Sequence, residues 1–89
     1  MGEKVGDLII VSSGDVSEYA LRAIVSLREL GEREVVVIKG RGDFIEKAID
    51  VYNEMKMRMG DSLKLVKVSI GSEKVGRRIL PYIEIRVKI

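Results

Sequence analysis

The sequence predicts an α/β fold, a two-layer α+β sandwich in which a four-stranded mixed sheet carries two helices on one face. Three observations support this prediction. Two short apolar runs, DLIIVS and EVVVIK, have the composition of buried strands. Each run precedes a segment whose apolar residues recur at steps of three and four, as on one face of a helix. Two further runs near the end alternate apolar and polar residues, which is typical of strands. The predicted order is β-α-β-α-β-β in one domain, residues 1–89.

The first strand is expected over Asp7–Ser12 and the first helix directly after Asp15. Glu18 follows Asp15 at the spacing of a capping box, in which each side chain accepts a hydrogen bond from a free amide of the first turn. Gly31 is expected to end this helix as its C-terminal cap. The apolar face of the helix is predicted to comprise Val16, Tyr19, Ala20, Ala23, Ile24, Leu27 and Leu30.

The second strand is expected over Glu34–Lys39, and the second helix begins near Asp43 and ends at Gly60. Gly40 and Gly42 are expected to take positive φ in the intervening turn. Asp43 and Glu46 form a second candidate capping box. The predicted apolar stripe of this helix is Phe44, Ile45, Ala48, Ile49, Tyr52, Met55 and Met59.

The third and fourth strands are expected over Leu63–Ile70 and Ile79–Ile89, joined by a polar, basic connection over 71–78. Pro81 has no amide hydrogen to donate to a neighbouring strand. We therefore expect it at a sheet edge, a bulge or the strand start. Right-handed crossovers place both helices on the same sheet face, so the other face is expected to be polar.

Several classes of function are disfavoured by what the composition lacks. There is no cysteine and no histidine, which removes thiolate nucleophiles, the commonest metal ligands and the commonest general base near neutral pH. Three acidic residues of the second helix have structural explanations: Asp43 and Glu46 as caps, and Asp50 as a residue that faces solvent or pairs with Lys47. We therefore expect no enzyme, no metal and no cofactor. No apolar run reaches ~18 residues and MGEKVGD lacks a signal pattern, so no membrane partner and a cytoplasmic location are expected.

The charge is unevenly spread along the chain. Residues 1–32 carry three basic and six acidic side chains, a net charge of −3, whereas residues 33–89 carry thirteen and eight, a net charge of +5. A basic second half suits a polyanionic partner, although an ordinary solvated surface explains the same charges.

Three groups of basic residues are candidates for phosphate contact. Lys39 and Arg41 lie at the Gly40-Arg41-Gly42 turn, where a helix start also offers free amides; a plain tight turn is the alternative. The 71–78 connection could lie along a duplex groove, or be only a solvated hairpin tip. The end of the second helix could contact phosphate, or only complement the helix dipole. The residues of these last two groups are Lys74, Arg77 and Arg78, and Lys56 and Arg58.

The stretch VVIKGRGDFIEKAIDVYNEMKMRMGDSLKLVKVSIGSE, followed by a basic turn and YIEIRVKI, resembles the Alba family of archaeal chromatin proteins, most closely its second paralogue group. The resemblance covers nearly the whole chain. It implies a homodimer, or a heterodimer with an Alba paralogue, that packages double-stranded DNA and also binds RNA with little sequence preference at the chromosome (nucleoid). It further implies that two β-hairpin arms reach into minor grooves. By position, the implied binding residues are Ser13, Gly14, Tyr19, Lys39, Arg41, Gly42, Lys47, Lys56, Arg58, Lys74, Arg77 and Arg78.

The sequence also departs from the family pattern. Ser13 and Gly14 stand where the family usually has two lysines, one of them regulated by acetylation, so that charge and that switch are absent. The first loop is left with hydroxyls and amides to offer a phosphate. Asp43 replaces an often basic residue, and Met59 replaces a phenylalanine used between dimers. These departures leave two alternatives open: a mainly RNA-binding protein, or a partner that modulates a more basic paralogue.

Overall fold

The computed structural model describes residues 3–89 and confirms the predicted element order. The first two residues of the N-terminal stretch inspected for a signal pattern lie outside this range. Three single-turn 3-10 helices connect the elements, at Gly31–Arg33, Gly42–Phe44 and Gly60–Ser62. The strands and helices are β1 (Lys4–Val11), α1 (Val16–Leu30), β2 (Glu34–Arg41), α2 (Ile45–Met59), β3 (Lys64–Val75) and β4 (Arg78–Lys88).

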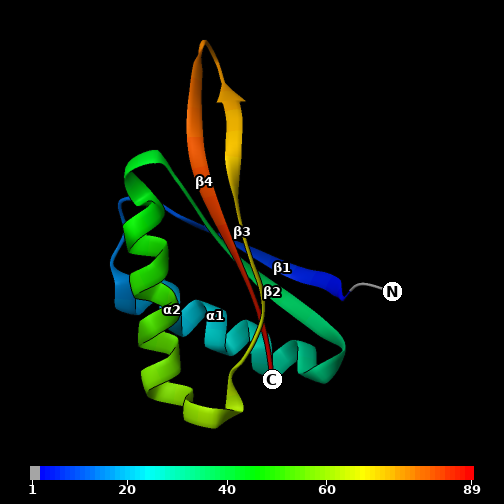
Figure 1. Ribbon diagram of the computed structural model, residues 1–89. Helices are drawn as coiled ribbons and strands as arrows, with labels where there is room; N and C mark the ends of the chain where they lie inside the picture. Colours follow the sequence, from blue (N-terminus) through cyan, green and yellow to red (C-terminus); the bar gives the residue numbers. More distant parts are fainter. Residues whose placement is uncertain (1–2) are drawn as a thin grey trace.

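The four strands form one mixed sheet in the order β1-β2-β4-β3. β1 pairs with β2 in parallel, whereas β4 pairs antiparallel with both β2 and β3. The β3–β4 hairpin therefore folds back so that β4 inserts between β2 and β3 (Figure 1). This insertion brings residues of the hairpin within reach of the end of β2.

Both helices pack on one face of the sheet, as predicted. Alternate residues of the strands meet the buried stripes of α1 and α2 in a single core. The helical stripes are confirmed with two exceptions. Ile49 is 40% exposed and lies outside the core, and Phe44 lies in the 3-10 turn before α2 and is not part of the core. Sheet and helix members of the core include Ile9, Val11, Val36, Ile38, Ile83, Ile85 and Val87, and Ala20, Ala23, Leu27, Ala48, Val51 and Met55.

The opposite sheet face, here called the open face, is not uniformly polar, so that expectation was wrong in part. Ile9 and Val11 point into the core, and the alternation of the strand then turns Leu8 and Ile10 to the open face. Both are nearly half exposed. Val37, also on this face, is buried at 4% exposure. The polar character holds only toward β4.

The two predicted capping boxes do not form. Asp15 is the N-cap residue of α1, but its side chain makes no capping hydrogen bond. α2 follows the 3-10 turn Gly42–Phe44, so its N-cap is Phe44 and not Asp43. The 3-10 turn moves the N-cap by one residue, from Asp43 to Phe44, which removes Asp43 from the position where its carboxylate could accept a bond from the first α-helical turn.

The segment 71–78, predicted as a connection, is instead part of a long β-hairpin. β3 continues to Val75 and β4 begins at Arg78, so only Gly76 and Arg77 form the turn. Gly76 has φ 63° at the first central position, as a type II′ hairpin turn requires. Figure 1 shows this hairpin extending beyond the rest of the molecule. We call residues 71–80 the arm.

Pro81 lies where the sheet changes from three strands to two. The pairing of β2 with β4 ends at Tyr82, so at Pro81 only β3 pairs with β4. The expectation of an edge position is confirmed, because on the β2 side of β4 no strand is present to accept an amide hydrogen. No helix within residues 3–89 is long and apolar enough to cross a membrane.

Candidate nucleic-acid interface

Lys39 and Arg41 project from the end of β2 onto the open face, and the arm supplies a carboxylate to both. Lys39 Nζ lies 2.7 Å from Glu73 Oε1, and Arg41 Nη1 lies 3.0 Å from Glu73 Oε2. Lys39 is also 3.3 Å from Glu84 Oε2, directly opposite on β4. Two cations therefore face two carboxylates, and this cluster carries no net charge.

The ion pairs explain the electrostatics of this cluster. The hydrogen bond to Glu73 raises the pKa of the Lys39 ammonium above 10.5, with Glu84 adding to the effect. Bonds from Lys39 and then Arg41 hold the pKa of the Glu73 carboxyl below 4.5. The Lys39 ammonium also lies 4.8 Å from the centre of the Tyr82 ring, within cation–π range. Lys39 is thus held from three sides, with its side chain 17% exposed.

The two glycines beside Arg41 serve different purposes. Gly42 has φ 56° and opens the 3-10 turn, as expected. Gly40 does not take positive φ, which corrects the prediction; it lies inside β2. A Cβ atom at Gly40 would collide with the carbonyl oxygen of Phe44, so glycine is needed for the close approach of the start of α2. Arg41 is left at the strand end with its side chain 38% exposed.

A cleft of about 190 Å³ lies beside Arg41, between the end of β1 and the arm. Its lining includes Ser12 on one side and Val75 and Leu80 of the arm on the other. The structure therefore brings Arg41, the first loop and the arm together, although they are distant in sequence.

Most polar groups of the first loop, Ser12–Gly14, are hydrogen-bonded within the fold, whereas the Ser13 hydroxyl, one of the groups predicted to meet a phosphate, stays exposed. The Tyr19 hydroxyl accepts hydrogen bonds from the amides of Ser12 and Gly14, each at 3.1 Å. The Lys47 ammonium donates to the carbonyls of the same two residues, at 3.1 and 2.6 Å. Ser13 is exposed and makes no side-chain hydrogen bond among residues 3–89.

Tyr19 is a buried aromatic residue whose hydroxyl anchors the first loop to α1. Its ring is buried at 8% exposure. The pKa of its phenol is lowered below 10.0 by the hydrogen bond with the Ser12 hydroxyl and, to a smaller extent, by those from the amides of Ser12 and Gly14. Lys47 on α2 and Tyr19 on α1 thus fix the loop from both helices.

Within residues 3–89, the arm gathers three cations without ion-pair partners on one projecting hairpin, whereas other unpaired cations, such as Arg22 and Arg33, lie on the body. Lys74, Arg77 and Arg78 are exposed, and within the described residues none of them is in an ion pair. Their charges lie at or beside the two-residue turn. A cationic tip on a projecting hairpin has the size and charge to follow a duplex groove.

Lys56 and Arg58 do not join this surface. They lie in the last turn of α2, about 20 Å along the helix from its start near Arg41. Lys56 caps the helix by donating to the carbonyls of Gly60 and Leu63, and Arg58 pairs with Glu54 at 2.7 Å. Both positive charges thus lie at the negative end of the helix dipole, as the structural alternative to phosphate contact predicted.

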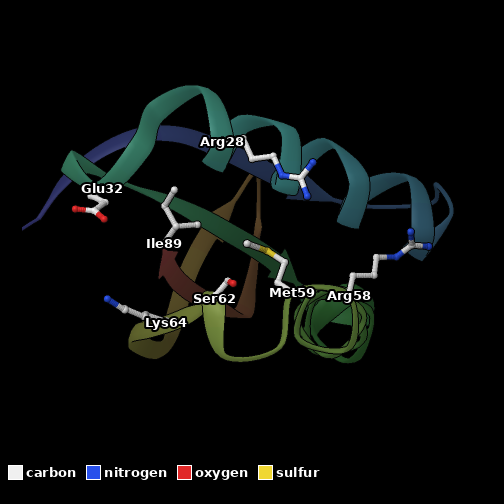
Figure 2. A pocket seen from close by; sticks show the side chains of 7 residues that line it. All are labelled: Arg28, Glu32, Arg58, Met59, Ser62, Lys64 and Ile89. Carbon is white, nitrogen blue, oxygen red and sulfur yellow. The ribbon is translucent and has the colours of Figure 1, made fainter.

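Arg58 also borders a hollow of about 500 Å³ at this far end of the molecule. Figure 2 shows Met59, Ser62 and Ile89 at its centre, whereas the guanidinium groups of Arg28 and Arg58 point to one side and Lys64 and Glu32 lie on the other. The cations do not converge on one point, so this hollow lacks the geometry of a phosphate site.

Glu73 and Glu84 are the residues that sequence reasoning missed. Glu73 lies in the segment predicted as a basic connection, and Glu84 lies on the polar face of the predicted fourth strand. Only the strand order shows that both carboxylates meet Lys39. Lys67 and Arg86, paired in register on the open face, are two further cations that belong to none of the three basic groups in the sequence. No group of three acidic side chains in residues 3–89 is placed to hold a metal ion.

Comparison with known proteins gives consistent results. The family model described as Alba matches residues 7–72. Two proteins named DNA/RNA-binding protein Alba 2, from Saccharolobus solfataricus and Saccharolobus shibatae, are each 41% identical over 88 residues, covering 99% of this chain and 97% of theirs.

Two solved structures share the fold at low identity. Alba from Thermoplasma volcanium gives a TM-score of 0.81 at 23% identity, covering 92% of this chain and 99% of that one. ALBA1 from Trypanosoma brucei gives 0.78 at 21%, covering 91% and 67%.

Proposed function

This chain belongs to the Alba family, and we propose that it is a non-enzymatic DNA- and RNA-binding protein that packages nucleic acid as a dimer, with little sequence preference. The observation that carries the proposal is the arm: Lys74, Arg77 and Arg78 lie on a projecting hairpin with no partner in the described chain. Because these cations are in no ion pair within the described residues, they can bind phosphates without first breaking a contact with a carboxylate of the protein.

The arm and the end of β2 form one continuous binding surface in this proposal. Glu73 joins the base of the arm to Arg41, so both lie along one side of the molecule. Contacts of this kind go to the sugar-phosphate backbone, which carries no base sequence. A protein that packages DNA in this way lies on the chromosome, so we propose the chromosome within the cytoplasm as its location.

The apolar edge of the sheet supports the dimer. Val68 and Ile70 pair in register with the buried Ile85 and Ile83 of β4, yet they are 48% and 79% exposed. β3 is an edge strand, and neither helix covers these side chains. A second copy would bury them, and burying one such side chain fully contributes about 1.5–3 kcal/mol.

A charge introduced at this edge tests the dimer. Ile70→Lys is expected to give a monomer by sedimentation equilibrium, whereas Leu21→Lys, at a 47% exposed position on α1, is the matched control and leaves the dimer intact. A monomeric wild type, or a dimeric Ile70→Lys protein, would refute the assignment of this interface.

A salt series tests the binding itself. The wild-type protein is titrated with several unrelated DNA duplexes and an RNA duplex of equal length, followed by fluorescence anisotropy. Binding is expected to weaken steeply with salt and to vary little among the DNA sequences. Salt-independent binding, or strong preference for one DNA sequence, would contradict the proposal. Tighter binding to RNA would favour the mainly RNA-binding alternative, since A-form duplexes are recognised through shape and 2′-hydroxyls.

One observation favours a second candidate, the modulatory heterodimer partner. The cluster of Lys39 and Arg41 is neutralised within the chain, and the first loop carries no lysine. Such a subunit would bind less tightly alone than beside a more basic paralogue. Mixing the two purified chains and measuring subunit exchange by native mass spectrometry decides this, because absence of exchange dismisses the candidate.

A further inference from the structure

Glu73 bridges the two cations at the end of β2 in a way that matches a phosphate group. Each carboxylate oxygen accepts from a different cation, Oε1 from Lys39 at 2.7 Å and Oε2 from Arg41 at 3.0 Å. The two non-bridging oxygens of a phosphodiester could accept from the same pair. The bridge joins residues 32 positions apart in the chain, across the intervening strand β4.

We propose that Glu73 occupies the phosphate position at Lys39 and Arg41 in the free protein, so that nucleic acid displaces its carboxylate when it binds there. The inference rests on the proposed function and adds a residue that sets its affinity. Glu73 is thus a positioning residue that holds the site closed and joins the base of the arm to the body.

The exposure of the groups allows this exchange. The Glu73 and Arg41 side chains are 29% and 38% exposed, so solvent and a ligand reach both. Displacing Glu73 separates two ion pairs, one with Arg41 and one with the less exposed Lys39. At no more than about fivefold in equilibrium constant for each pair, the combined cost is at most about 25-fold. A phosphate in a duplex backbone gains counterion release on the same cations, which is of similar or larger size.

The neighbouring carboxylate decides which cation is released. Glu84 sits directly opposite Lys39 on β4 and keeps its contact at 3.3 Å when Glu73 leaves. Arg41 has no other acidic contact within the described residues. Displacement of Glu73 therefore leaves the cluster at a net charge of +1, with Arg41 as the main phosphate ligand.

The test compares Glu73→Gln with the wild type, using a short mixed-sequence DNA duplex as the probe. Glu73→Gln is expected to bind roughly 3- to 10-fold more tightly at low salt, with a log–log salt slope steeper by about one. Glu3→Gln is the matched control, since it also removes one negative charge and one exposed ion pair, with Lys88 at 3.2 Å. Its affinity is expected to stay within about twofold of wild type.

The outcomes separate this inference from the proposed function. Binding by wild type with no gain in Glu73→Gln, or an equal gain in Glu3→Gln, overturns the inference alone. Absence of binding by both wild type and Glu73→Gln overturns the proposed function and the inference with it.

A second measurement needs no variant. In the wild-type protein, the 13C signal of the Glu73 carboxyl is expected to shift on saturation with the duplex, because its two cationic partners leave. An unchanged carboxyl signal in the saturated complex overturns the inference.

Discussion

Replacing Arg77 and Arg78 together by alanine removes two of the three cations that the arm presents without partners. If each arginine neutralises one phosphate, the slope of log K against log[salt] becomes shallower by about 1.8. The same relation gives about eightfold in affinity per contact at ~0.1 M salt, or roughly 60-fold for each arm engaged. The loss should be similar on unrelated sequences, because backbone contacts carry no base information.

The assay is fluorescence anisotropy of a labelled duplex titrated at several salt concentrations. Arg22→Ala with Arg33→Ala is the matched control: both are exposed arginines outside the proposed surface, and their removal lowers the net charge equally. An unchanged slope in the arm variant, or an equal loss in the control, would refute the assignment of phosphate contacts to the arm.

Three further predictions concern the framework of the site. Gly40→Ala is expected to lower the free energy of unfolding by about 1–3 kcal/mol in urea titrations, because its Cβ atom meets the Phe44 carbonyl; wild-type stability would contradict this. Tyr19→Phe removes the acceptor of two loop amides, so the hydrogen exchange of these amides, measured by NMR, should accelerate roughly tenfold. Unchanged rates would contradict the role of the Tyr19 hydroxyl in holding the loop. The pKa of Glu73 is lowered, so the stability that its ionised carboxylate gives the fold is present above pH 4.5 and is lost as the pH falls through the lowered pKa. The pKa of Lys39 is raised, so the stability that its ammonium gives is present below pH 10.5 and is lost as the pH rises through the raised pKa. The difference in melting temperature between wild type and Glu73→Gln should follow the acid limb, and a difference that persists at the lowest pH would count against this.

Local pattern was enough to predict the two helices and the strands of the body of this protein. Steps of three and four gave α1 and α2, and β-branched runs gave β1 and β2, because these signals depend on residues close in the chain. The basic arm was also visible as a charge cluster. Its strand structure was not, since outside the body both faces of a hairpin meet solvent and the usual alternation is lost.

The sequence by itself therefore determined the element order, the core stripes and the positions of the basic residues. Only the tertiary structure decided which of those residues are free. Insertion of β4 between β2 and β3 places Glu84 opposite Lys39 and brings Glu73 to Lys39 and Arg41. The packing of α1 and α2 likewise fixes the first loop through Tyr19 and Lys47. The physical reason is that an ion pair depends on distance in space, and the sheet order that sets this distance is not encoded in any short stretch of chain.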